Sequence, residues 1–205
     1  MRIRRRWMVG MVAPVLFSLI APDPGQAQDA PVTADTPVLL TSCGQSPGPT
    51  FVKLFLGRLG LDHELLEQAT AQDLVDHQDA GTPFRSVIIV TGASLKGMGA
   101  AGVSMPDELA RTAALIAEAR RQGLTIIGAH VEGMDRRAQG AAPGDNSDEQ
   151  SIDAVMPNSD VMVIRLDGNE DRRFSVISEA EGIPLVLFEK NMEMGDAFGS
   201  VFNKN

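Results

Sequence analysis

Side chains that could bind a small anion stand at the ends of several apolar segments of this sequence. Three are cations in a chain of net charge −9, namely Lys96, Arg136 and Arg137. The others can form hydrogen bonds: Ser42, Gln45, Ser46, Thr91, Ser94 and His130. Cations opposite the backbone N–H groups of helix N-termini bind carboxylates and phosphates. We therefore expect these residues to bind a small anionic, carboxylate-type ligand.

The two arginines also have a purely structural interpretation. They could form ion pairs with acidic residues of a solvated loop, the candidates being Asp145, Asp148 and Glu149. Both interpretations have equal weight at this stage.

A nucleophile paired with a histidine is a second kind of chemistry that the sequence allows. Cys43 follows an apolar segment, where the dipole of the next helix could lower its thiol pKa, and His130 ends a later segment. Ser42 could replace Cys43 as the nucleophile. No third residue that would orient the histidine is identifiable, and the G-x-S-x-G pattern is absent. A hydrolase-like enzyme using Cys43 or Ser42 with His130 therefore remains the alternative function.

Glycines at 97–102 match the G-x-G-x-x-G pattern of dinucleotide-binding loops, but their context does not. The first glycine comes six residues after Thr91, where the expected strand ends, and the chain has no tyrosine for a dehydrogenase Tyr/Lys pair. We expect no nicotinamide cofactor, and we interpret the glycines as a tight loop with close backbone approach.

The sequence also gives no indication of a metal site. The chain has three histidines, which are far apart in the sequence: His63, His77 and His130. We therefore expect no metal.

The composition narrows the classes of protein that need to be considered. The chain has 205 residues, 43% of them hydrophobic, which suits one globular domain. A deficit of Lys and Arg against Asp and Glu, 18 to 27, argues against nucleic-acid binding, which depends on neutralising phosphates.

The first 27 residues have the pattern of a secretory signal peptide. Arginines near the N-terminus precede an uncharged apolar run, and small residues around Ala27 suit cleavage there. We expect a flexible tether over 28–36 and one domain over 37–205. Cleavage would leave 14 basic and 26 acidic residues, a net charge of −12. The mature domain is then periplasmic or secreted, not inserted in the membrane, with a membrane transporter as a possible partner.

Alternation of apolar strands and amphipathic helices predicts an α/β fold. The run Val87–Val90 is unbroken, which is typical of a central parallel strand covered on both faces. On the helix expected at 104–122, Leu109, Ala113, Ile116 and Ala117 should face the sheet. We expect a single doubly wound, flavodoxin-like three-layer sandwich with a mainly parallel five- or six-stranded sheet. The expected strands are 37–42, 63–69, 85–91, 124–131, 160–166 and 184–188, and the last helix, 194–202, should dock on the sheet.

Three segments together resemble a bacterial family of exported single α/β domains of unknown function. They read TSCGQSPGP at 41–49, VTGASLKGMGAAG at 90–102 and HVEGMDRR at 130–137, the last followed by Ser147 and Asp148. The resemblance covers nearly all of the mature chain. It implies an exported α/β domain without an established activity, so it adds no catalytic residue.

Overall fold

The computed structural model describes residues 32–138, 142–144 and 146–204, and it confirms the predicted α/β sandwich. Its six strands form one sheet with the order β2-β1-β3-β4-β5-β6, and every neighbouring pair is parallel. This is the flavodoxin-like order with one further strand. The strands are β1 (Val38–Cys43), β2 (His63–Leu65), β3 (Ser86–Thr91), β4 (Thr125–His130), β5 (Val161–Arg165) and β6 (Leu185–Phe188).

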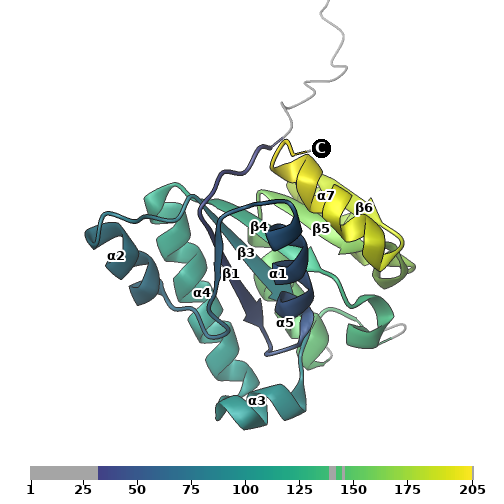
Figure 1. Ribbon diagram of the computed structural model, residues 1–205. Helices are drawn as coiled ribbons and strands as arrows, with labels where there is room; N and C mark the ends of the chain where they lie inside the picture. Colours follow the sequence, from purple (N-terminus) through teal and green to yellow (C-terminus); the bar gives the residue numbers. More distant parts are fainter. Residues whose placement is uncertain (1–31, 139–141, 145, 205) are drawn as a thin grey trace, which may run out of the picture.

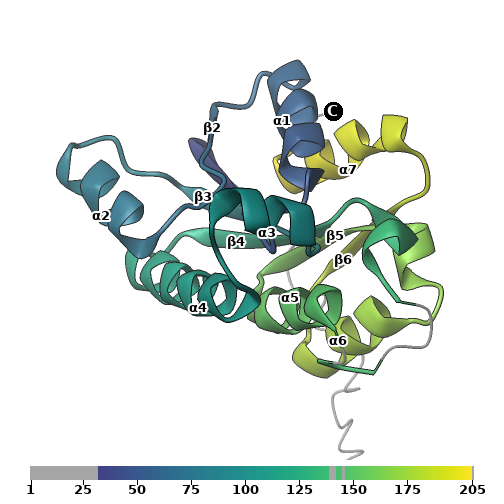
Figure 2. The same ribbon diagram turned by 90° about the horizontal axis from the view of Figure 1, so that it is seen from below.

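Helices cover both faces of the sheet, as right-handed crossovers between parallel strands require. Figure 1 shows α1 and α7 in front of the sheet, and in Figure 2 α4, α5 and α6 lie on the opposite side. The arrow of β1 points towards α3, so α3 lies at the carboxyl edge of the sheet. The helices are α1 (Gly48–Arg58), α2 (Ala71–Asp79), α3 (Leu95–Ala101), α4 (Met105–Gln122), α5 (Ser147–Val155), α6 (Arg173–Glu181) and α7 (Met194–Val201).

Strand β3 is buried at all of its positions, as its apolar run predicts. Successive side chains of a strand point to opposite faces, and the core divides accordingly. Leu40 and Val90 belong to the apolar cluster under α1 and α7. Leu39 and Ile89 belong to the cluster under α2 and α4. This alternation decides which strand-end residues can meet at a site.

Helices α2 and α4 each begin with a capping box. Thr70 accepts a hydrogen bond from the backbone N–H of Asp73, and Ser104 does the same with Asp107. In both boxes the aspartate accepts a bond from the N-cap backbone N–H in return, which satisfies two donors that the helix itself cannot. Helix α4 thus has a fixed start.

The packing face of α4 agrees only in part with the predicted one. Ile116 is buried as expected, whereas Ala113 and Ala117 are exposed, and the fully buried positions include Glu108, Thr112 and Leu115. The expected face followed the most apolar residues, but the helix instead turns a carboxylate towards the sheet.

Two other expectations about the chain need correction. The glycine-rich segment after β3 forms a helix, α3, rather than a loop. The tether does not extend to residue 36, because Ala34 is buried and donates a backbone hydrogen bond of 2.9 Å to Val201. Asp35 is likewise bonded through its backbone to the Ser86 hydroxyl. The predicted signal peptide, residues 1–27, lies outside the described residues.

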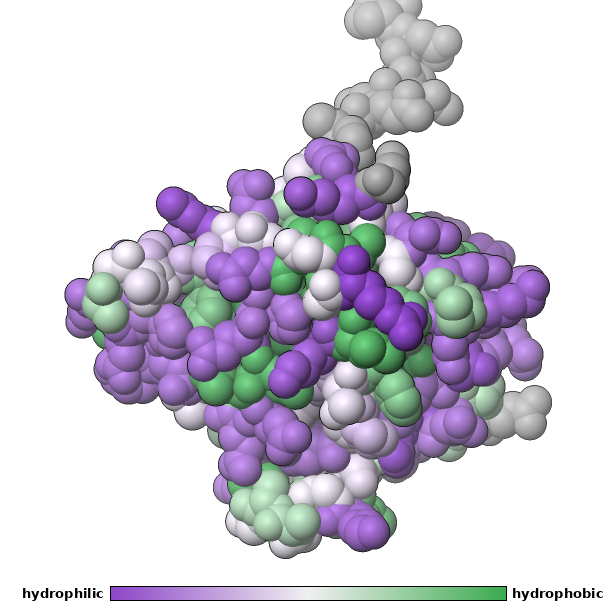
Figure 3. Space-filling model, in the orientation of Figure 1, coloured by the Kyte–Doolittle hydropathy of each residue, from purple (hydrophilic) through white to green (hydrophobic). Residues whose placement is uncertain are grey.

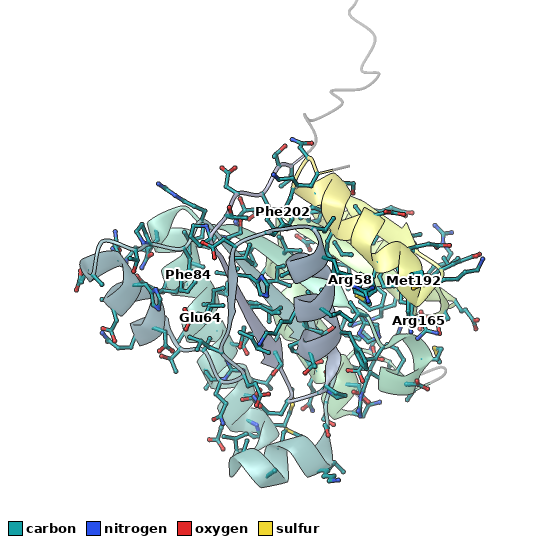
Figure 4. All side chains as sticks on the ribbon, viewed as in Figure 1. Arg58, Glu64, Phe84, Arg165, Met192 and Phe202 are labelled. Carbon is teal, nitrogen blue, oxygen red and sulfur yellow. The ribbon has the colours of Figure 1, made fainter. Side chains whose placement is uncertain are left out.

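The C-terminal helix docks on the sheet as predicted. Phe198 of α7 is fully buried, and Phe202, at the end of the helix far from α3, is 6% exposed (Figure 4). Figure 3 shows apolar patches between hydrophilic side chains on the face that α1 and α7 cover, where Phe51 is about half exposed. Within the described residues, no helix has the length and hydrophobicity needed to cross a bilayer.

Candidate functional site

A pocket of about 760 Å³ opens at the carboxyl edge of the sheet, where ligands bind in folds of this class. It lies between the loop after β1, the loop after β2 and helix α3, which crosses the edge in the foreground of Figure 2. The structure brings six of the predicted ligand residues to this pocket: Ser42, Gln45, Ser46, Ser94, Lys96 and Arg136. Thr91, His130 and Arg137 do not line it.

The loops after β1 and β3 are joined directly beneath the pocket. Gly44 has a φ of +104°, and a Cβ there would lie 2.6 Å from the carbonyl oxygen of Gly92, so only glycine fits. The carbonyl of Gly44 accepts a 2.7 Å hydrogen bond from the N–H of Ser94, and Gln45 forms an antiparallel bridge with Ala93. The two loops therefore form a single pocket floor.

Gly97 explains why the segment after β3 is rich in glycine. A Cβ at this position would overlap the carbonyl oxygen of Gln45. Its backbone N–H donates to the hydroxyl of Ser94, the N-cap of α3, at 3.0 Å. The predicted close backbone approach is thus correct for Gly97, although it occurs within a helix. It lets α3 pack directly on the β1 loop.

Glu108 holds the β1 loop from below. Its Oε2 accepts hydrogen bonds from the N–H of Gly44 at 2.8 Å and from Nε2 of Gln45 at 3.0 Å. Arg111 bonds both carboxylate oxygens and also reaches the carbonyl oxygens of Ser42 and Ala69. Burial alone would raise the pKa of Glu108, but the bonds from Arg111, Gly44 and Gln45 outweigh it and lower this pKa.

Sequence reasoning missed Glu108 and Arg111 as part of the site. In the sequence, Glu108 is only an acidic residue near the start of the helix expected at 104–122. A usable indication was present, because Met105, Glu108, Thr112, Leu115 and Ala119 follow helical spacing and are the buried face of α4. A carboxylate within such a stripe needs a buried partner.

The two cations at the pocket differ in their surroundings. Nε of Arg136 donates to Glu132 at 3.1 Å, and Nη1 donates to the carbonyl of Ala93 at 3.0 Å. The other oxygen of Glu132 accepts the N–H of Gly48 at the start of α1. Lys96 is exposed and forms no ion pair with any described residue. Lys96 is therefore the less compensated positive charge of the pocket.

Arg137 has the structural role that the second interpretation predicted, and its assignment as a ligand residue is corrected. Its guanidinium is 1% exposed and forms ion pairs with Glu149 at 2.5 Å and Asp171 at 2.6 Å. It also donates to the carbonyl of Gly168. Neither Arg137 nor its partners Glu149 and Asp171 line the pocket. Asp145, another predicted partner, lies outside the described residues.

The expected Cys43–His130 pair is not formed. Cys43 pairs with Thr91 in the sheet register, and Thr91 Oγ1 contacts Nδ1 of His130 at 3.0 Å, so Thr91 lies between the two. Their backbones are two strand spacings apart, roughly 9–10 Å. Burial raises the pKa of the Cys43 thiol to about 11, which opposes the expected lowering. Cys43 is thus a buried core residue.

His130 is a buried structural residue rather than a base. Its Nε2 lies 3.0 Å from the carbonyl of Gly133, which can only accept, so Nε2 carries the proton and Nδ1 accepts from Thr91. Burial lowers the pKa of His130 to about 4, and the charge of Arg137 acts in the same direction.

Ser42 cannot pair with His130 either. It precedes Cys43 by one residue and therefore points to the opposite face of the sheet from Cys43 and Thr91. Its hydroxyl donates to the carbonyl of Glu67 at 3.3 Å and lines the pocket. Among the described residues, no histidine or cysteine lines this pocket, and no group of acidic, histidine and cysteine side chains could hold a metal.

The fold and the pocket define a flavodoxin-like α/β domain with a polar pocket at the carboxyl edge of a parallel sheet. The chain belongs to the family described as a domain of unknown function, DUF6305, whose model matches residues 35–202. This confirms the resemblance to an uncharacterised family. No curated protein matches the chain.

Several solved structures have distantly similar folds. A proposed lipolytic protein of the G-D-S-L family from Desulfitobacterium hafniense is 14% identical, with 80% of this chain and 98% of that chain covered and a TM-score of 0.39. A GDSL-like lipase from Bacteroides thetaiotaomicron is 14% identical, with coverages of 73% and 66% and a TM-score of 0.34. A psychrotrophic esterase from Pseudoalteromonas is 11% identical, with coverages of 82% and 95% and a TM-score of 0.35. At these scores the likeness carries no argument about activity.

Proposed function

We propose that this domain binds a small molecule with a carboxylate group in the pocket at the carboxyl edge of its sheet. The observation that carries the proposal is the convergence of six polar side chains on one pocket. They come from the end of β1, the loops after β1 and β3, helix α3 and the segment after β4. Lys96 supplies an ammonium group that forms no ion pair with any described residue, and Arg136 supplies a guanidinium at the wall. A carboxylate is a suitable partner for both.

The hydroxyl groups of Ser46 and Ser94 support the same proposal. Each accepts a backbone N–H, from Gly48 at 3.3 Å and from Gly97 at 3.0 Å, so the hydroxyl hydrogen remains to be donated to a ligand. The pocket volume is in the range of sites that bind small molecules. The proposal is for binding, because none of the described histidines lines the pocket, where it could pair with Ser42.

The experiment is a thermal-shift and calorimetry screen of the mature domain against carboxylates, phosphate and sulfate. A ligand that binds only the folded state raises the melting temperature. Lys96→Met should reduce the affinity for a bound carboxylate by about tenfold, the loss of one charge-assisted hydrogen bond. Lys53→Met removes an exposed lysine of α1 that is outside the pocket and should change nothing. No stabilisation by any of these anions would refute the proposal.

We also propose that residues 1–27 direct export and that the domain acts outside the cytoplasm as a binding accessory to a membrane transporter. Fractionation of cells that produce the full chain, followed by N-terminal sequencing, tests the first step. The mature protein should begin at Gln28. A cytoplasmic protein with an intact N-terminus would contradict export.

A further inference from the structure

We infer, on the basis of the proposed function, that the ligand carries a cationic amine in addition to its carboxylate, as an amino acid does. The pocket has two sides of opposite hydrogen-bonding character. The side at β1 and the loop after β2 offers acceptors, and the side at α3 and Arg136 offers donors. A plain carboxylate would use only the second side.

The amide of Gln45 has a fixed orientation. Its Nε2 lies 3.2 Å from the carbonyl oxygen of Glu67 and 3.0 Å from Oε2 of Glu108. Both partners can only accept, so the atom that faces them must be the nitrogen, and both of its hydrogens are used. What Gln45 can still offer a ligand is the carbonyl oxygen Oε1, which is an acceptor.

Ser42 and Glu67 add acceptors on the same side. The hydroxyl hydrogen of Ser42 is donated to the carbonyl of Glu67 at 3.3 Å, which leaves its oxygen lone pairs for a ligand. Glu67 itself lines the pocket, is exposed, and forms no ion pair with any described residue. A ligand group that donates hydrogens and carries positive charge would suit the carboxylate, the amide oxygen and the hydroxyl oxygen together. A primary ammonium group does both.

The opposite side has the reverse character. Lys96 is a donor and a cation, Ser94 retains its hydroxyl hydrogen, and Arg136 contributes a guanidinium. A ligand with negative charge at both ends would face repulsion from Glu67, and a ligand with only an amine would leave Lys96 uncompensated. A zwitterion with one ammonium and one carboxylate group matches both sides.

The test compares matched ligands on the mature domain by calorimetry at millimolar concentration. The probes are the twenty common L-amino acids, and for each its analogue without the α-amine, such as propanoate for alanine and 4-methylpentanoate for leucine. At least one amino acid should bind about tenfold more tightly than its deamino analogue, since a charge-assisted bond contributes about that factor. Equal affinity for both would overturn this inference and leave the proposed carboxylate binding intact. No binding by either set would overturn both.

A variant pair assigns the effect to the acceptor side. Glu67→Gln should lower the affinity for the bound amino acid to that of its deamino analogue, while the affinity for the analogue stays the same. Glu181→Gln, at an exposed position of α6 outside this pocket, is the matched control. If Glu67→Gln weakened the amino acid and the analogue equally, the acceptor side would not recognise an amine and the inference would be wrong.

Discussion

Glu108 of α4 accepts a hydrogen bond of 2.8 Å from the backbone N–H of Gly44, which precedes it by 64 residues. The same carboxylate holds Gln45 and is paired with Arg111, so this ion pair of α4 fixes the pocket floor. The Glu108 side chain is 1% exposed and that of Arg111 is 12% exposed, so removing either charge should carry a large cost.

Glu108→Ala should therefore lower the free energy of unfolding by about 3–5 kcal/mol, because it leaves the Arg111 guanidinium buried without its carboxylate. Urea denaturation measures the change. Glu118→Ala removes a surface carboxylate from the same helix, where it pairs with Arg121, and should have a much smaller effect. Equal effects of the two variants would mean that Glu108 does not hold the loop.

Gly97 and Gly99 are two glycines of the same helix with opposite expected responses to alanine. Gly97→Ala should destabilise the domain by about 1–3 kcal/mol and weaken ligand binding, because the new Cβ overlaps the carbonyl of Gln45. At Gly99 nothing lies within 4 Å of a Cβ, so Gly99→Ala should stabilise the helix by about 0.5–1 kcal/mol. Thermal unfolding of both variants decides the matter. A harmless Gly97→Ala would show that α3 does not pack on the β1 loop.

Substitution of Arg136 should mainly affect ligand binding, whereas substitution of the neighbouring Arg137 should mainly affect stability. Arg137→Met leaves the fully buried Glu149 without its closest cation and should cost about 3–5 kcal/mol of unfolding free energy. Arg136→Met should change stability far less and reduce the affinity for a bound carboxylate by about tenfold. Urea denaturation and calorimetry on both variants provide the comparison. A large loss of stability in Arg136→Met together with a loss of affinity only in Arg137→Met would contradict these roles.

His130 should make the domain less stable as the pH falls from neutral. Burial lowers its pKa from 6.5 to about 4, so the unfolded chain takes up the proton first. The stability that the neutral imidazole contributes is complete above pH 6.5 and is lost as the pH falls towards 4, in total about 3 kcal/mol. Unfolding free energies measured across this window should show that decline, and His130→Gln should reduce it. An NMR titration in which the imidazole of His130 titrates near pH 6.5 would contradict the prediction.

Much of the candidate site was predictable because of one rule about parallel sheets. Residues that follow the strands meet at the carboxyl edge whatever the details of packing, and this rule places Ser42, Lys96 and Arg136 at one pocket. It does not tell which face a residue points to. Ser42 and Cys43 are adjacent, yet one lines the pocket and the other is buried in the core below.

Local sequence patterns were sufficient to predict the strands, the helices and their alternation. The run Val87–Val90 predicted a central strand, and the alternation of apolar strands and amphipathic helices predicted the α/β fold, because these features depend on residues close together in the chain. Tertiary structure alone decided that Arg136 reaches the pocket while Arg137 is buried with Glu149, and that Glu108 turns towards Gly44. The positions of these side chains depend on partners from distant segments of the chain. A charged side chain is buried where ion pairs and hydrogen bonds offset the cost of removing it from water.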